Sequence, residues 1–455
     1  MRITKVSVKK LFGIFDHEIP LNQESRITII HGPNGFGKTT LLSMIHGLFN
    51  GNLWVFYDVP FEEFCAEIDT GERIFVVRDK SDPDSQDTRL KIIRDCDDES
   101  GGASYDLANR NGYLQHIRNV AASKSALQQV YNDLWLDFDT GAVSTTQELV
   151  DVYLEIQAEL YATLTPDWFK HLCEKTHTRF AESQRLQGKI PAAPFRNQYH
   201  SIRQPIPVLP DTTVERLSRD LVKEIDTAFE YYSEVSRELD SSFLKRLVDT
   251  NPEAKYSRDD LKEDLERLEE ERKEFVALGL LDKDNNALDS ELDIYREDFK
   301  AVSIHVHDRK AKQQVLKDIA QRLRILVDIV NERFKFKMLR IDREKGFVFL
   351  SHHGLEIPLE RLSSGEQHEL VLFYRLLFHI QKDSLILVDE PEISLHVTWQ
   401  RKFLMDLKDV VDMSHFDVLV ATHSPQIVHD KYDWMVDLNN PEDELADDVL
   451  EYAAV

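Results

Sequence analysis

The chain has 455 residues, of which 42% are hydrophobic, and a formal net charge of −26 at pH 7. This length allows two or three domains with cores of their own. The negative charge excludes a surface that binds nucleic acid all over, because phosphates would be repelled at every approach. Without a membrane-spanning apolar run or a secretory signal, we expect a cytoplasmic protein with no membrane contact. We expect the cysteines to be reduced thiols, because they are far apart in sequence: Cys65, Cys96 and Cys173.

Residues 1–102 have the pattern of strands and turns with one helix, and we expect them to form the N-terminal lobe of an α/β domain. A strand leads into HGPNGFGKTT at 31–40, which has the GxxxxGK[ST] spacing and is followed by a helix. Its glycines let backbone N–H groups wrap phosphates, Lys38 reaches the β- and γ-phosphates, and Thr39 offers a hydroxyl to Mg²⁺. The predicted contacts of this nucleotide loop are Asn34, Gly35, Gly37, Lys38, Thr39 and Thr40.

Residues 103–334 have mostly a helical period, and we expect a helical insertion, with one strand near 177–186. Long charged helices are predicted at 211–249, 257–279 and 290–334. The second of them has an apolar stripe made of Leu261, Leu265, Leu268 and Phe275. Acid–base pairs three and four residues apart flank this stripe. The pattern favours a helical hairpin or a short coiled-coil arm.

Residues 335–455 return to strands, and we expect them to form the C-terminal lobe. The apolar run LILV, typical of a strand buried on both faces, ends on Asp389 and Glu390. Because carboxylates are costly to bury without a cation, we predict that Thr39 and Asp389 hold Mg²⁺ and that Glu390 orients or deprotonates the attacking water. A simpler interpretation, in which both acids only cap the following turn, stays open.

Two further motifs flank this acidic strand in sequence, LSSGEQ at 362–367 and ATHSP at 421–425. Together with the nucleotide loop and DEPEISLH at 389–396, their order resembles the ABC-type ATPase class of structural-maintenance, Rad50-like, RecF-like and OLD-type proteins. The amino-acid sequences of these motifs are most similar to those of the ATPase subunit of Septu anti-phage defence systems and of related retron ATPases. The resemblance implies an α/β fold, a P-loop ABC-type ATPase head split by a helical, short coiled-coil-like insertion.

The resemblance also implies roles for single residues. The head would dimerise head to tail around Mg-ATP, with His423 as the switch histidine that senses the γ-phosphate. Ser394 to His396 would form the D-loop at the dimer interface. Gln184 would be the Q-loop glutamine that contacts metal and water, although Gln187 is an alternative. Ser363 and Gly365 would be the signature residues that touch the γ-phosphate of ATP bound to a second subunit, with Glu366 beside them. Ser364 and Gly365 begin a helix whose N-terminus can itself bind an anion.

A separate HNH-type nuclease is the partner that the resemblance implies, in a nucleotide-dependent switch or sensor for defence against phage. Only 32 residues follow His423, so we expect the nuclease to be another chain. Two alternatives stay open. In a DNA repair or recombination ATPase, residues 309–345 would contact phosphates through twelve Lys or Arg against five acids. In an ATP-binding scaffold, turnover would be negligible.

Overall fold

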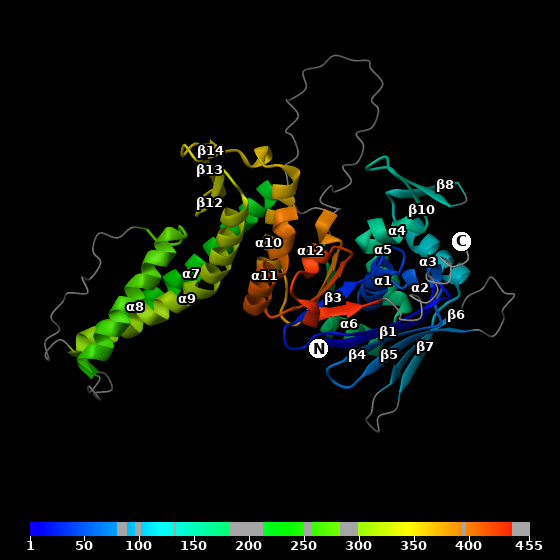
Figure 1. Ribbon diagram of the computed structural model, residues 1–455, viewed down its shortest axis with the longest axis horizontal. Helices are drawn as coiled ribbons and strands as arrows, with labels where there is room; N and C mark the ends of the chain where they lie inside the picture. The colour runs from blue at the N-terminus through cyan, green and yellow to red at the C-terminus, as the bar shows by residue number, and fades with distance from the viewer. Residues whose placement is uncertain are drawn as a thin grey trace, which may run out of the picture. The chain divides into compact units, whose positions relative to one another are not determined.

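The computed structural model describes residues 1–79, 89–95, 102–131, 133–181, 213–249, 257–282, 299–393 and 397–438. The chain forms two compact units, and the first combines Met1–Ile206 with Ile380–Val455. The second unit is Pro207–His379. The α/β fold with a helical insertion that the sequence predicts is confirmed, and Figure 1 shows its elements in chain order.

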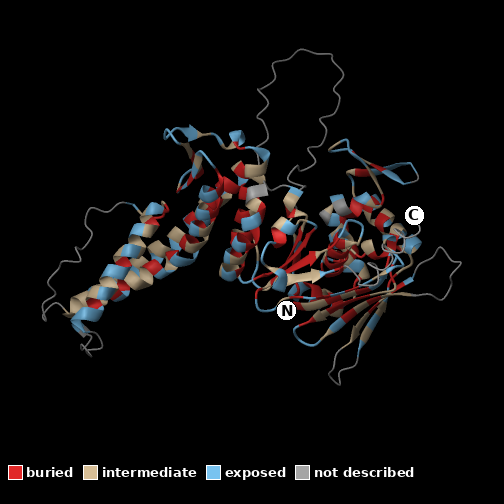
Figure 2. Cartoon of the chain, in the orientation of Figure 1, coloured by how far each residue is buried: buried red, intermediate tan, exposed pale blue. Residues whose placement is uncertain are grey.

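A parallel sheet forms the centre of the first unit. Its strand order is β11 (Thr178–Phe180), β15 (Leu385–Asp389), β16 (Asp417–Thr422), β3 (Ile27–His31) and β17 (Met435–Asp437). All neighbouring strands run parallel. Strands β15, β16 and β3 are buried along almost their whole length, as the apolar run at 385–388 predicts (Figure 2).

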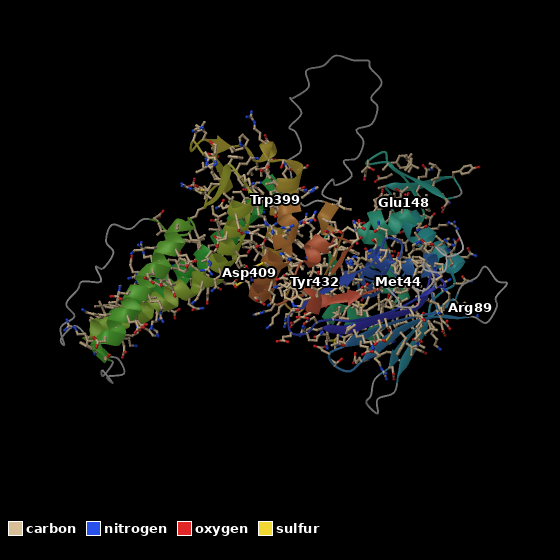
Figure 3. The ribbon with its side chains drawn as sticks, viewed as in Figure 1. Met44, Arg89, Glu148, Trp399, Asp409 and Tyr432 are labelled. Atoms are coloured by element: carbon tan, nitrogen blue, oxygen red, sulfur yellow. The ribbon has the colours of Figure 1, made fainter. Side chains whose placement is uncertain are left out.

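An antiparallel sheet of six strands completes the core of this unit. Its order is β2 (Phe15–Pro20), β1 (Ile3–Leu11), β4 (Glu63–Ile68), β5 (Arg73–Asp79), β6 (Arg89–Asp95) and β7 (Ala103–Asp106). One cluster of buried side chains joins this sheet to the parallel sheet and to helix α1 (Lys38–Phe49). Met44 of α1, labelled in Figure 3, belongs to that cluster and is fully buried. The helix that follows the nucleotide loop is therefore anchored in the core.

Shorter helices and a small sheet surround this core. The helices are α2 (Val55–Asp58), α3 (Arg110–Ser123), α4 (Glu148–Val152), α5 (Leu154–Leu164), α6 (Asp167–Lys175), α11 (Val397–Ser414) and α12 (Pro425–Val428). The small sheet is β10 (Val143–Thr145), β9 (Leu134–Asp137) and β8 (Leu127–Tyr131), in a region where the sequence predicts helices. Strands β8 and β10 are short and largely exposed, so they have little of the apolar alternation that marks a strand.

Three long helices dominate the second unit: α7 (Thr213–Asp249), α8 (Arg258–Ala277) and α9 (Phe299–Arg333). Helix α9 packs against both others, and the predicted apolar stripe of α8 is buried at Leu261, Leu268 and Phe275. Strands β12 (Lys337–Asp342), β13 (Gly346–Ser351) and β14 (Glu356–Ile357) and helix α10 (Ser364–Phe378) follow. None of the described helices, in either unit, is both long and apolar enough to cross a membrane.

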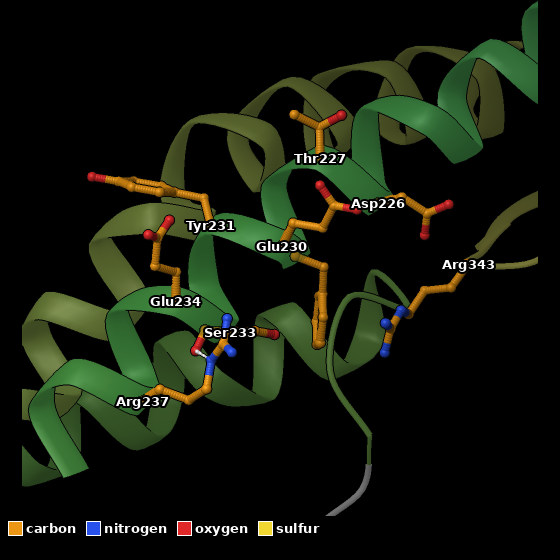
Figure 4. Close-up of a pocket in the computed structure, with 9 residues that line it drawn as sticks. Asp226, Thr227, Glu230, Tyr231, Ser233, Glu234, Arg237 and Arg343 are labelled. Carbon is orange, nitrogen blue, oxygen red and sulfur yellow. Dashed lines mark hydrogen bonds between the residues drawn. The ribbon is translucent and has the colours of Figure 1, made fainter. Parts of the chain in front are cut away.

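A groove of about 760 Å³ lies where α7 meets the turn between β12 and β13 (Figure 4). The guanidinium of Arg343, in that turn, lies 3.6 Å from the centre of the Phe229 ring of α7. Acidic residues Asp226, Glu230 and Glu234 line the groove together with two arginines. The cation–π contact stabilises the packing of the turn on the helix, which shapes the groove.

Candidate nucleotide-binding site

The candidate site begins where three parallel strands end together. In the register of the sheet, Asp389 at the end of β15 is opposite Ala421 of β16. Thr422 at the end of β16 is opposite His31 at the end of β3. The segments that follow these strands therefore start from one edge of the sheet, and ligands of parallel α/β sheets bind at this carboxyl edge.

The nucleotide loop has the backbone that its glycines predict. Gly35 and Gly37 have φ angles of 94° and 82°, in the left-handed region that favours glycine. A Cβ at Gly37 would lie 2.5 Å from Cδ2 of Leu11, so no larger residue fits there without a shift. Helix α1 begins directly afterwards, and its first backbone N–H groups are an anion-binding feature. Two further predicted contacts belong to this region, Asn34 as an exposed loop residue and Thr40 as a half-buried residue of α1.

Strand β2 supports the loop from the N-terminal lobe. The Nε2 atom of His17 lies 2.9 Å from the carbonyl oxygen of Phe36, and the ring of Phe15 stacks on that of Phe36 with centres 4.9 Å apart. Burial lowers the pKa of His17, so its ring stays neutral and donates to this carbonyl through Nε2. These contacts hold the middle of the loop in place.

Lys38 is buried at the start of α1 and bends back over its own loop. Its Nζ donates to the carbonyl oxygens of Gly32 at 2.7 Å and Pro33 at 2.8 Å. Burial lowers the pKa of Lys38, while nearby carboxylates, led by Glu390, act in the opposite direction. The ammonium is thus positioned between the loop and the acids that follow β15.

Asp389 meets Thr39, although the two residues come from opposite ends of the chain. The side chain of Thr39 lies close enough to the Asp389 carboxylate to influence its pKa. Burial raises the pKa of Asp389, while Thr39 and Lys38 oppose the shift. Its Oδ1 atom is buried and has no hydrogen-bond partner among the described residues. A buried carboxylate oxygen without a partner is what a cation ligand requires.

This pair suits Mg²⁺ better than a cation held by protein ligands alone. The described part of the chain contains no group of three or more His, Cys, Asp or Glu that could hold a metal. Mg²⁺ is usually bound by one or two protein oxygens together with substrate phosphates and water. The hydroxyl of Thr39 and the free oxygen of Asp389 fit such an ion.

Glu390 has an unusual backbone conformation. Its φ angle is 43°, which for a residue other than glycine costs of the order of 1–3 kcal/mol. Its N–H donates to the carbonyl oxygen of Ala421 at 2.9 Å, which ties the turn to β16. The Oε1 atom of Glu390 lies 3.7 Å from Nδ1 of His423, and this histidine side chain is 44% exposed. The structure thus brings the two predicted catalytic residues together.

Glu392 is a residue that the sequence does not single out. Its Oε1 atom accepts hydrogen bonds from the hydroxyl of Thr422 at 2.7 Å and from the backbone N–H of His423 at 3.0 Å. The same oxygen lies 3.0 Å from Nδ1 of His423. The only sequence signal is a third acid in the run DEPE, and that run does not reveal a partner 31 residues away.

The signature residues lie in the second unit, at the start of α10. Ser363 caps the helix: its side chain accepts from the N–H of Glu366, whose Oε2 accepts from the N–H of Ser363 at 2.7 Å. Burial would raise the pKa of Glu366, but hydrogen bonds from Lys337 and Ser363 lower it overall. Ser364 and Gly365 form the first turn of the helix. Gln184 and Ser394 to His396 lie outside the described residues.

Comparisons with known proteins agree with a nucleotide-binding chain. A family model described as an AAA ATPase domain matches residues 1–428. The protein ea59 of Escherichia phage lambda is 36% identical over 94 residues, which make up 20% of this chain and 17% of ea59. The match therefore spans less than a fifth of that relative.

Two solved Smc head domains cover most of the chain with little sequence identity. The head domain of Pyrococcus furiosus Smc, with an extended coiled coil and bound to the C-terminal domain of ScpA, is 14% identical, with a TM-score of 0.33. The comparison covers 94% of this chain and 91% of that one. The Thermotoga maritima head domain is 11% identical with a TM-score of 0.29, and the same shares of the chains are covered.

Proposed function

Because the chain belongs to the AAA ATPase domain family, we propose that it hydrolyses ATP to ADP and phosphate at the edge of its parallel sheet and acts as a nucleotide-dependent switch. The observation that carries the proposal is that the Thr39 side chain lies beside the Asp389 carboxylate. This places the loop that would hold the phosphates next to the strand end that would hold the metal. A turn cap alone would not account for a buried carboxylate oxygen without a partner.

Each residue of the site has a task in this reaction. The N-terminus of α1 and the ammonium of Lys38 bind the phosphates, with Lys38 exchanging its loop carbonyls for phosphate oxygens. A Mg²⁺ ion bound by Thr39 and Asp389 would supply positive charge against the developing negative charge of the phosphoryl group. Glu390 accepts the proton of the attacking water, and His423 donates or accepts at the same water or phosphate.

The switch requires a second copy of the chain. In our proposal, the signature residues of one subunit meet ATP held by the nucleotide loop of the other, and hydrolysis releases the pair. The order of the motifs supports this arrangement, as does the capped helix start at Ser363, whose first turn leaves N–H groups for an anion. The biological role that we propose is control of a separate HNH-type nuclease in a Septu-like defence system.

Two variants test the ATPase. Lys38→Ala should abolish nucleotide binding, measured with a fluorescent ATP analogue. Glu390→Gln should bind ATP and lower kcat about 10²–10⁴-fold. ATP binding that survives Lys38→Ala would contradict the site. If wild type and Glu390→Gln bind ATP equally and both turn over at background, the chain is an ATP-binding scaffold and the hydrolysis proposal fails.

The switch and the partner need their own test. Light scattering should show dimers or larger species of Glu390→Gln with ATP, and Ser363→Arg should prevent their ATP-dependent formation. Co-expression with an HNH nuclease encoded next to this chain should yield a complex whose nuclease activity depends on nucleotide. A nuclease whose activity is the same with wild type and Lys38→Ala would contradict the switch.

Contact with nucleic acid is a second candidate function, for which some cations of the basic stretch 309–345 are better placed than others. Much of the positive charge of α9 lies beside acids of neighbouring helices: Arg309 pairs with Glu269 at 2.9 Å and Lys310 with Asp264 at 2.6 Å. Such cations are less available to phosphates. The basic stretch 309–345 therefore retains its exposed charge mainly after α9.

A groove of about 580 Å³ lies in that remaining part of the stretch. Phe336 is 71% exposed there, with a φ angle of 71°, and its ring meets that of His352 edge to face. Lys335 and Arg340 line the same groove, and within the described residues neither forms an ion pair. Exposed aromatic rings among cations suit bases and phosphates of single-stranded nucleic acid.

Charge reversal tests this second candidate. Lys335→Glu with Arg340→Glu should weaken binding of a fluorescent oligonucleotide and flatten its salt dependence, because each phosphate contact releases counterions. Lys9→Glu is the control, since Lys9 is an exposed cation of the first unit that already pairs with Glu63. Equal affinity in the double variant and the control would exclude the groove.

A further inference from the structure

The carboxylate of Glu392 has contacts that point to a role of its own. We propose that Glu392 is a positioning residue, which fixes the orientation and the tautomer of the His423 ring. The inference rests on the proposed function, because it concerns how His423 is presented to the substrate. Its geometry, however, is a property of the protein without nucleotide.

Two hydrogen bonds and the His423 ring converge on one oxygen of this side chain. The Oε1 atom of Glu392 faces the hydroxyl of Thr422, the backbone N–H of His423 and the Nδ1 atom of His423, at 2.7, 3.0 and 3.0 Å. An ionised carboxylate can only accept hydrogen bonds. A proton on Nδ1 of His423 would face this acceptor at 3.0 Å, and this tautomer would leave Nε2 as the nitrogen that can meet the substrate.

This arrangement places the exposed ring of His423 on a buried carboxylate that is held in position. Glu392 is held by the 3₁₀ turn Pro391–Ile393, and its side chain is only 7% exposed, whereas that of His423 is 44% exposed. Thr422 is fully buried at the end of β16 and fixes the position of Oε1. A free histidine prefers no single orientation, so this anchor lowers the entropy that the ring loses when it contacts the substrate.

The same two segments are joined by a second set of contacts that does not involve the Glu392 side chain. The Nε2 atom of Gln400 in α11 donates to the backbone carbonyl of Glu392 at 3.3 Å. The Oε1 atom of Gln400 accepts from the hydroxyl of Ser424 at 3.1 Å. A variant that lacks the Glu392 carboxylate therefore retains a link between the turn and the end of β16, and it should fold.

The tautomer can be measured directly in the nucleotide-free protein. Long-range ¹⁵N–¹H spectra of protein labelled at histidine report which ring nitrogen is protonated, and His423→Gln identifies the signals of this ring. Wild type should show protonated Nδ1. Glu392→Gln should show the same, because an amide oxygen also accepts, whereas Glu392→Ala should shift the ring toward protonated Nε2. Identical spectra for Glu392→Ala and wild type would overturn the proposal.

Kinetics give the second measurement. Glu392→Ala should lower kcat about 10–100-fold, the usual effect of removing a partner of a functional histidine, with little change in KM. Glu392→Gln should recover much of the lost kcat. Thr422→Val should lower kcat less than Glu392→Ala does, because the Glu392 carboxylate still lies beside Nδ1 of His423. Glu24→Gln, which removes an exposed carboxylate of the same unit, is the control.

The outcomes separate this inference from the proposed ATPase. Wild-type kcat retained in Glu392→Ala, or a loss confined to KM, would overturn the positioning role while leaving the ATPase intact. A wild-type chain without ATP turnover would contradict the ATPase, and the spectra of nucleotide-free protein would still decide the role of Glu392.

Discussion

The acidic side chains of the long helices and those at the edge of the parallel sheet differ in their hydrogen-bond partners. On the helices, acidic side chains pair with basic ones. Arg246 of α7 makes two hydrogen bonds to Asp308 of α9, at 2.6 and 2.8 Å. At the sheet edge, Asp389 and Glu392 each retain a buried oxygen without a hydrogen-bond partner among the described residues. Paired acids stabilise the fold, whereas acids with a free oxygen cost stability and remain available to a ligand.

The largest expected effect comes from removing an acid of the sheet edge. Asp389→Asn should lower metal-dependent ATP turnover by about 100-fold or more, because the proposed ligand of the cation is lost. The same variant should melt at a higher temperature than wild type without nucleotide. Burial raises the pKa of Asp389, so its ionised form destabilises the folded state at neutral pH. A lower melting temperature with unchanged turnover would show that Asp389 stabilises the fold in the same way as the paired acids of the helices.

Acid should destabilise the first unit through His46 of α1. Burial lowers the pKa of His46 to about 4, so in the folded protein the ring resists protonation. As pH falls below about 6.5, the unfolded chain binds the proton first, and up to about 3 kcal/mol of stability is lost toward pH 4. Urea unfolding at several pH values measures this slope. His46→Gln should flatten it, and an unchanged slope would show that other groups cause the acid effect.

Weakening a partly buried ion pair on the helices should lower the free energy of unfolding and leave ATP turnover nearly unchanged. Asp308→Asn should lower the free energy of unfolding by about 1–3 kcal/mol, because it weakens two charged hydrogen bonds to Arg246. ATP turnover should stay within about twofold of wild type, since a change below about 0.5 kcal/mol is expected away from the site. A large loss of turnover with unchanged stability would mean that this pair belongs to the switch.

The smallest effect is expected at an exposed pair of the same helices. Arg324 and Glu274 lie 3.1 Å apart, with side chains 54% and 37% exposed. Glu274→Gln should change the free energy of unfolding by less than about 1 kcal/mol, because water screens such pairs. A change as large as that of Asp308→Asn would show that burial does not determine the value of these pairs.

The nucleotide loop and the long helices could be predicted from the sequence because their signals are local. The glycine spacing at 32–37 requires a wrapped backbone, and the structure has positive φ angles at Gly35 and Gly37. The apolar run before Asp389 predicts a strand buried on both faces, and β15 is such a strand. The roles of the site residues stay predictions, although the structure places Thr39, Asp389, Glu390 and His423 at one sheet edge.

Other features depend on contacts between distant parts of the chain. No local pattern signals that β16 lies between β15 and β3, although this order brings the two ends of the chain together. The short exposed strands β8 and β10 lack the alternation that would reveal them. The sequence by itself determined which residue types stand at which spacing, since periodicity and backbone freedom are local properties. Only the tertiary structure decided which carboxylates have hydrogen-bond or ion-pair partners and which keep an oxygen without one. The reason is that a carboxylate such as that of Glu392 contacts residues that are distant in sequence.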